Sequence, residues 1–372
     1  MFRAKTVFII GAGASVEVGL PMGPELLEKI AKAIDFTFEW SRPKTGDLAI
    51  FNALKFALNE GNEVEKLNQH LKAARQLSTS AMQAISIDNI IEALEDEKIE
   101  LVGKIGIAKM ILDAEGKSKF FRHEEGFSDR IDVSNFIGCW YGSLVKIMAE
   151  NRKKSEISNI FDNIEIINFN YDRCLEHFLP VSLASYYGVS PDDVRILMEN
   201  LRMHRPYGSV GKLPWQKHEA PSVQFGAASP QNLAAVASQI RTFSETIEEG
   251  EELAAIKNAV ATADRIVFLG FAFHRQNVRL IAQEVQEHTE ILAIAYRISE
   301  SDKGVIDDEL TKAFEFGGML NEGRIELADM TCDGLFKAYW RTLTAEKSDR
   351  EDMEMPGYPE IRMPSIPSWP RA

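Results

Sequence analysis

Residues 6–15 read Thr-Val-Phe-Ile-Ile-Gly-Ala-Gly-Ala-Ser, and this stretch decides the fold that we expect. The continuous apolar run Val7–Ile10 is typical of a buried strand in a parallel sheet. Glycines directly after such a strand let the backbone approach a diphosphate closely, and the N-terminus of a following helix favours negative charge. The stretch therefore predicts a nucleotide site, although a strand–glycine–helix turn can also serve packing alone.

The glycine spacing differs from that of the usual dinucleotide fingerprint. The fingerprint has its third glycine three residues after the second, where this chain has Val16, and the next glycine is Gly19. The usual acidic partner of the ribose ends a second strand about 20 residues further on. Asp35 lies near that distance, but it ends a helical pattern, Glu25–Ile34. The chain is therefore a poor match to an ordinary Rossmann dehydrogenase.

Composition limits the classes of partner. The net charge of −14 argues against a general nucleic-acid or anionic-membrane surface. No apolar run approaches the roughly 20 residues that span a bilayer, and the N-terminus lacks a signal-peptide pattern. Cys139, Cys174 and Cys332 are too far apart to predict a disulfide framework or a paired-thiolate zinc site. A cytoplasmic protein without a metal is expected.

Apolar patterns predict strands that alternate with helices. Further strands are expected at Ile164–Phe169, Arg265–Gly270 and Ile291–Tyr296. Strands separated by helices indicate an α/β fold, with a Rossmann-like parallel sheet covered by helices on both faces. Spacing of three and four residues predicts a large helical insertion at about residues 47–153 and a smaller one at about 181–201.

Residues 1–345 are expected to form one domain, followed by a tail at 346–372. The tail is charged at first, and its last 17 residues hold five prolines. Proline excludes a regular helix or a central strand there. We expect an extended surface segment, and a strap across a neighbouring subunit is the alternative.

Three predicted strands end in residues that suit a ligand. These ends are Gly11–Ser15, Asn168–Asp172 and Gly270–His274. Ligands of open parallel sheets bind beyond the carboxyl ends of the strands, so the three segments should meet. The two amides and the carboxylate of Asn168, Asn170 and Asp172 offer donors and acceptors to a sugar. A helix cap at Asn170 is the alternative, and it explains only one of these residues.

Five short motifs resemble those of the sirtuin-like family and follow one another in the family's order. Together they span residues 7 to about 298. Each motif is weak alone, and their order is more specific. They are the glycine turn 11–15 with Gly19-Leu20-Pro21, Ser86-Ile87-Asp88 as in bacterial members, Asn170-Tyr171-Asp172, Arg205-Pro206-Tyr207-Gly208-Ser209 in place of a His-Gly-Ser segment, and Leu269-Gly270-Phe271 followed by Asn277.

The resemblance implies a Rossmann-like fold that binds NAD, and chemistry that breaks the bond between nicotinamide and its ribose. By this match, Asn170 would orient the ribose and a water, and Asp172 would lie near the nicotinamide amide. Tyr207 would occupy the place of the catalytic histidine. The residues that the match assigns to NAD are Gly11, Gly13, Ala14, Ser15, Gly19, Pro21, Asn170, Asp172, Gly208, Ser209, Gly270, Phe271, His274 and Asn277.

Two departures narrow what the resemblance implies. Protein-deacetylating sirtuins usually carry a zinc ribbon of paired cysteines, which this chain lacks, so it is more similar to zinc-less bacterial relatives of the antiphage-defence type. Tyr207 also replaces a histidine, and a phenol with a pKa of about 10 is a poor base at neutral pH. His274 is another candidate base. His204 would need a bulge, because residues three apart on a strand point to opposite faces.

The resemblance thus implies an NAD hydrolase that yields nicotinamide and ADP-ribose, acting as a defence effector in a homo-oligomer or with a partner protein. The alternative, which Tyr207 favours, is a catalytically silent module that binds or senses NAD or ADP-ribose. A transferase of ADP-ribose is a third possibility, for which no acceptor site stands out.

Overall fold

The computed structural model describes residues 1–40, 42–58, 63–121, 136, 138–217, 221–243, 245, 250–315 and 325–346. The predicted tail and its possible strap lie outside the described residues, apart from Glu346.

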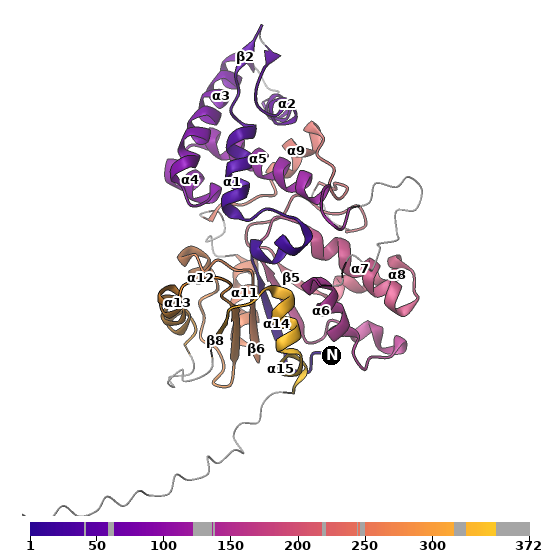
Figure 1. Ribbon diagram of the computed structural model, residues 1–372. Helices are drawn as coiled ribbons and strands as arrows, with labels where there is room; N and C mark the ends of the chain where they lie inside the picture. The colour runs from indigo at the N-terminus through magenta and orange to yellow at the C-terminus, as the bar shows by residue number, and fades with distance from the viewer. Residues whose placement is uncertain are drawn as a thin grey trace, which may run out of the picture.

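A six-stranded parallel sheet forms the centre of the molecule (Figure 1). Its order is β5-β4-β1-β6-β7-β8. If these six strands are counted in chain order, the sheet reads 3-2-1-4-5-6, which is the doubly wound Rossmann order. The predicted α/β Rossmann-like fold is confirmed. The strands are β1 (Thr6–Ile10), β4 (Ile164–Asn168), β5 (Arg202–His204), β6 (Arg265–Leu269), β7 (Glu290–Ile294) and β8 (Ile325–Ala328).

Strand register brings the predicted site segments to one edge of the sheet. Ile10 at the end of β1 is level with Asn168 of β4 and with Leu269 of β6. The chain leaves β1 toward β4 and later returns to the other side of β1 as β6. This is the switch point at which open parallel sheets bind ligands.

Side chains alternate between the two faces of the sheet, so each face has its own core. Phe8 and Ile10 pack in one hydrophobic cluster with α6 (Trp140–Ala149), α7 (Cys174–Tyr187) and α14 (Cys332–Ala338). Val7 and Ile9 belong to a second cluster. The helices that follow the later strands and contribute to it are α11 (Glu251–Ala261), α12 (Arg275–Ile281) and α13 (Glu300–Ala313).

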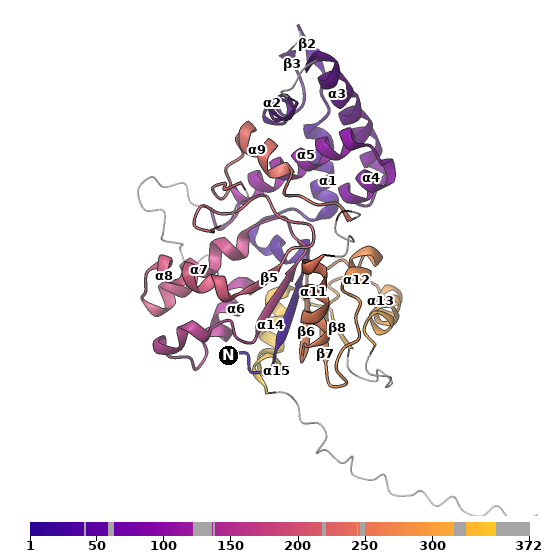
Figure 2. The same ribbon diagram turned by 180° about the vertical axis from the view of Figure 1, so that it is seen from behind.

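A helical lobe lies beyond the carboxyl ends of the strands (Figures 1 and 2). The second hydrophobic cluster continues from the sheet into this lobe. Its helices are α1 (Gly23–Ala33), α2 (Leu48–Ala57), α3 (Glu63–Ser80), α4 (Ile87–Leu94), α5 (Glu97–Glu115) and α9 (Pro230–Ala237). Between α1 and α2 lie two short strands, β2 (Phe38–Glu39) and β3 (Arg42–Pro43).

The lobe differs from the predicted insertion at 47–153. It also includes α1, before that range, and α9, far beyond it, because both helices bury their apolar faces against α5. Helix α6 falls inside the predicted range but packs on the sheet, since Trp140 and Leu144 share a cluster with Phe8.

The segment predicted as a small insertion at 181–201 holds the end of α7, then α8 (Pro191–Leu197) and the short helix η5 (Met198–Asn200). Helix α7 begins at Cys174 and continues through Pro180, whose missing N–H removes one helical hydrogen bond.

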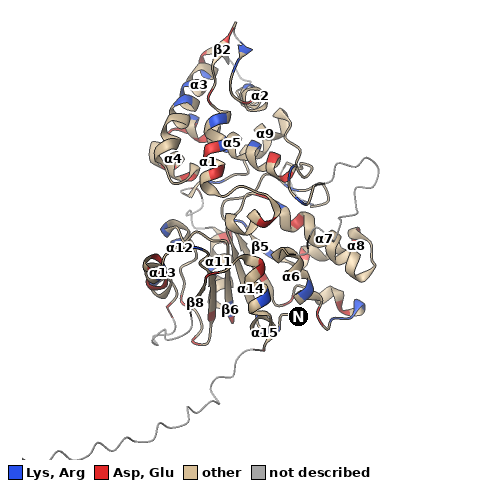
Figure 3. Cartoon of the chain, viewed as in Figure 1, with Lys and Arg blue, Asp and Glu red and all other residues tan. Residues whose placement is uncertain are grey.

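Charged residues of both signs are interspersed along the helices rather than gathered on one element (Figure 3). Within the described ranges, no helix is both long enough and apolar enough to cross a membrane.

Candidate active site

The glycine turns after β1 and β6 pack directly against each other. The Gly13 N–H donates to the carbonyl of Gly270 at 2.9 Å. A Cβ on Gly11 would lie 2.7 Å from the Gly270 carbonyl oxygen, and a Cβ on Gly13 would lie 2.9 Å from the Gly270 Cα. Packing between the turns therefore already requires these glycines, whether or not a diphosphate also lies there.

A polar cluster of Ser15, Asn170 and Asp172 lies beside these turns. The Ser15 Oγ donates to Asp172 Oδ2 at 2.8 Å, and the Asn170 Nδ2 donates to Ser15 Oγ and to the Gly11 carbonyl, both at 3.1 Å. All three residues are at most 6% exposed, so water competes little for these bonds. These bonds join the segments Gly11–Ser15 and Asn168–Asp172, and the bond from Gly13 to Gly270 brings in the third segment that was expected to meet them.

The capping role falls on Asp172 rather than on Asn170. The Asp172 Oδ1 accepts the Cys174 N–H at 3.1 Å, at the first residue of α7. The Asn170 N–H instead donates to the Asn168 side chain at 3.0 Å. Because the Asp172 carboxylate accepts a hydrogen bond from the first residue of α7, its position in the cluster is fixed. The Asn170 side chain does not cap this helix.

Two residues of α6 complete the cluster, and sequence reasoning did not assign them to the site. The Tyr141 hydroxyl lies 3.3 Å from Ser15 Oγ, and the Trp140 indole donates to the Ala14 carbonyl at 2.7 Å. Burial raises the pKa of Tyr141 well above its usual range, so the hydroxyl stays protonated. The sequence pattern predicted only the apolar face of this helix. That pattern does not show where the Tyr141 hydroxyl and the Trp140 indole N–H point.

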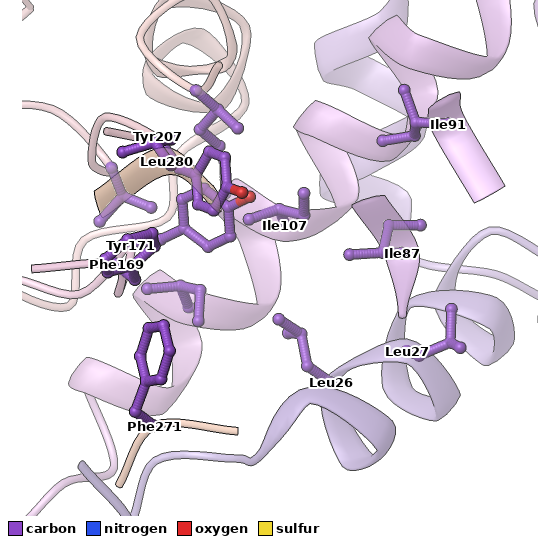
Figure 4. Packing of buried hydrophobic residues seen from close by; sticks show 14 of the residues in the cluster. Leu26, Leu27, Ile87, Ile91, Ile107, Phe169, Tyr171, Tyr207, Phe271 and Leu280 are labelled. Atoms are coloured by element: carbon purple, nitrogen blue, oxygen red, sulfur yellow. The ribbon is translucent and has the colours of Figure 1, made fainter. Parts of the chain in front are cut away.

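An aromatic group borders the same edge of the sheet (Figure 4). The ring of Phe169 lies 5.1 Å from that of Phe271 and 5.7 Å from that of Tyr207, centroid to centroid. Tyr171 lies 6.5 Å from Tyr207. Apolar residues of the helical lobe, Ile107 among them, extend the same hydrophobic cluster. Phe271 and Tyr207 therefore both lie against Phe169, the residue that directly follows β4.

Tyr207 cannot act as a general base in this arrangement. Its hydroxyl donates to Asn277 Oδ1 at 2.5 Å, and its side chain is buried. Burial, with Asp88 and Glu92 nearby, raises the pKa of Tyr207 well above its usual range. The phenol is therefore protonated at neutral pH and links the turn after β5 to α12.

Asp88 on α4 supplies a carboxylate next to this aromatic group. The Tyr171 hydroxyl donates to Asp88 Oδ1 at 2.6 Å. Burial raises the pKa of Asp88, while the hydrogen bond from Tyr171 and the nearby His274 act in the opposite direction. The sequence motif Ser86–Asp88 suggested a resemblance but no role. Its position could not be predicted, because it depends on how the lobe sits over the sheet.

Other predicted NAD contacts have local structural explanations. Gly208 has φ +73°, and a Cβ there would lie 1.9 Å from the Gln239 carbonyl oxygen. The Ser209 Oγ donates to the Gly211 carbonyl at 3.1 Å. Gly19, with φ +97°, ends the short helix η1 (Ala12–Val18), and Pro21 is buried just before α1. The Gly19 N–H donates to the backbone carbonyl of Ser15 and so reaches the polar cluster through its backbone. Within the described chain, no hydrogen bond joins Pro21, Gly208 or Ser209 to Ser15, Asn170 or Asp172.

The two histidines considered as bases differ in position. The imidazole of His204 pairs with Glu165 Oε1 at 2.9 Å, between β5 and β4, so it does not replace the missing histidine. His274 is exposed at the N-cap of α12, near enough to Asp88 to lower the pKa of that carboxyl group.

Nothing in the part of the chain that the structure describes forms a cluster of three or more metal-ligating side chains. The three cysteines are buried and free. Two cavities, of about 260 and 470 Å³, lie beside β5 and in the helical lobe, and residues of the polar cluster line neither.

No protein-family model matches the chain, and no curated protein matches it at a significant level.

Proposed function

We propose that this chain is a sirtuin-like protein that binds NAD beyond β1, β4 and β6 and hydrolyses it to nicotinamide and ADP-ribose. The observation that supports this most is the polar cluster of Ser15, Asn170 and Asp172. It lies at the switch point of a doubly wound sheet, where such folds bind nucleotides. The order of the motifs along the sequence, which resembles that of the sirtuin-like family, is the reason for proposing a sirtuin-like protein.

In the proposed reaction, the bond from ribose C1′ to the nicotinamide nitrogen breaks, and its electron pair neutralises the pyridinium. A water oxygen bonds to C1′ and loses a proton. Asn170 orients the ribose and this water through its amide, after exchanging its bonds to Ser15 and Gly11 for bonds to the substrate. Fixed amide dipoles of this kind stabilise charge without reorganisation.

Asp88 is the better acceptor for the proton of the water. Tyr207 is protonated and bonded to Asn277, whereas Asp88 is a carboxylate whose pKa is raised by burial. A carboxyl group whose pKa moves toward neutrality is a more effective general base than an unperturbed one. Asp88 also bonds Tyr171, the chain neighbour of Asn170.

The biological setting follows from the resemblance alone. We propose a cytoplasmic effector of antiphage defence that works as a homo-oligomer or with a partner defence protein.

The test is incubation of the purified full chain with NAD and chromatographic measurement of nicotinamide. Asn170→Ala should lower the rate by about 100-fold or more, the usual effect of removing one stabilising donor. Asn159→Ala is the matched control, because Asn159 is exposed on the short helix η4 (Lys154–Asn159) and should leave the rate unchanged. Tight NAD binding by the wild-type chain without nicotinamide release would rule out hydrolysis.

One observation favours a second function, a silent module that senses NAD or ADP-ribose. Tyr207 stands in the place of the family's histidine, and its hydroxyl is held by Asn277. Tyr207→His distinguishes the two functions: a silent binder should gain hydrolysis with this change, whereas an active hydrolase should not depend on it. Calorimetric titration with NAD and ADP-ribose measures binding in both variants.

A further inference from the structure

A second region with ligand-binding chemistry lies beside β5, outside the polar cluster. A cavity of about 260 Å³ is bounded there by α7, η5, β5 and residues 212–217. Its apolar lining comes from Met198, Leu201, Met203 and Trp215. An aromatic ring beside flexible methionines suits a planar apolar group, because both pack adaptably against ring faces.

The charges that line the cavity are paired, with one exception. Glu176 accepts from Arg205 through both carboxylate oxygens, at 2.7 and 2.8 Å, and both side chains are buried. Glu199 pairs with Lys217 at 3.5 Å on the exposed rim.

Lys212 is the cation that remains without a counter-ion. Among the described residues, no carboxylate lies within ion-pair distance of its ammonium group, and its side chain is half-buried. Burial lowers the pKa of Lys212; the charges of Glu176 and Glu252 act in the opposite direction, and the nearby Arg205 adds to the effect of burial. A partly desolvated ammonium without a partner gains most when an anion binds beside it.

We propose that this cavity binds a small aromatic carboxylate, with the carboxylate at Lys212 and the ring against Trp215. Three cations and two carboxylates line the cavity, which leaves one net positive charge. That charge matches a monoanion better than a phosphate monoester, which carries nearly two negative charges. The proposal does not depend on NAD hydrolysis.

Arg205 connects the cavity with the candidate active site. Its Nη1 donates to the Asn170 carbonyl at 2.7 Å, while its other nitrogens hold Glu176 in the cavity wall. A ligand that displaces Glu176 or reorients Arg205 therefore changes the support of the Asn170 backbone.

The test is calorimetric titration of the full chain with benzoate, its neutral isostere benzamide, and AMP as a phosphate monoester. Benzoate should bind about 10-fold more tightly than benzamide and than AMP, a difference of about 1.4 kcal/mol. Lys212→Gln should weaken benzoate binding by about 10-fold. Lys212→Arg should retain it, and Lys146→Gln, the same change at an exposed lysine of α6, should have no effect.

Equal affinity for benzoate and benzamide would overturn the proposal, as would unchanged benzoate binding by Lys212→Gln. Tighter binding of AMP than of benzoate would overturn the choice of a carboxylate. If Lys212→Gln fails to fold in a thermal melt, the comparison of the three compounds on the wild-type chain decides.

Discussion

Gly270 shows how strongly single residues hold the two turns together. Its φ is +57°, and a Cβ there would lie 2.0 Å from the Ala14 amide nitrogen, an atom of the backbone. Gly270→Ala should therefore lower the free energy of unfolding by about 3 kcal/mol or more, through left-handed strain and overpacking. Urea denaturation measures the loss.

The matched control is Gly304→Ala in α13, where a new Cβ would meet nothing within 4 Å. This change should stabilise the protein by about 0.5–1 kcal/mol, because alanine loses less entropy in a helix. Similar effects of the two substitutions would show that the turns are not in contact.

His177 makes stability depend on pH. Its ring stacks on Phe225 with centroids 4.0 Å apart, and burial lowers its pKa to about 4. An unfolded histidine has a pKa of about 6.5, so the fold favours the neutral form. This contribution is present in full above about pH 6.5 and is lost as the pH falls toward 4.

From this group the chain should lose about 2 kcal/mol of stability between pH 7 and 5. His177→Phe keeps the ring stacking but cannot titrate, so its stability should fall less over the same range. Urea midpoints at the two pH values give the comparison. Parallel losses in both proteins would show that His177 is already protonated in the fold.

At the scale of elements, a buried ion pair joins α5 to the start of α7. The Glu115 carboxylate accepts from the Arg173 guanidinium at 2.5 and 3.1 Å, and also from the Gly226 N–H at 3.1 Å. Both side chains are at most 1% exposed. Burial raises the pKa of Glu115, and the attraction to Arg173 opposes this shift only in part.

Glu115→Gln should destabilise the protein by about 3–5 kcal/mol, because it leaves the Arg173 charge buried without its partner. Thermal or urea unfolding measures this. Glu97→Gln, at an exposed position in the first turn of the same helix, should change stability by less than about 0.5 kcal/mol. A small effect at Glu115 would mean that water or another group satisfies Arg173.

Apolar runs made the central strands predictable from the sequence. The two edge strands were not predicted, because they are short or carry polar residues. β1, β4, β6 and β7 each have at least four buried residues, most of them apolar, although buried Glu165 interrupts the pattern in β4. Short β5 (Arg202–His204) and β8, with its exposed Glu326, lie at the two edges of the sheet and lack that pattern.

At the scale of the whole molecule, the candidate site was predictable only where one rule governs position. The carboxyl ends of neighbouring parallel strands must meet, so Ser15, Asn170 and Asp172 could be placed together from the sequence. The contacts of Asp88 with Tyr171 and of Tyr141 with Ser15 depend on how separate helices dock, across 83 and 126 residues of chain. No local sequence pattern encodes a contact between residues so far apart along the chain.

The hydrophobic cluster that runs from the sheet into the helical lobe should make the molecule unfold as one unit. Ile105 of α5 is fully buried and shares this cluster with Ile9 of β1. Ile105→Ala removes about 2–5 kcal/mol of packing from the lobe. Because the core is continuous, the amides of β1 and β6 should lose protection by the same free energy as those of α5.

Hydrogen exchange followed by mass spectrometry, on peptides that cover residues 6–10, 97–115 and 265–269, measures this coupling. Val305→Ala, at an exposed position of α13, is the control and should leave all three peptides nearly unchanged. If Ile105→Ala lowers protection in α5 alone, the lobe unfolds independently of the sheet. In that case the contacts of Asp88 would belong to a separately folding part, and the lobe could open over the polar cluster without disturbing the strands.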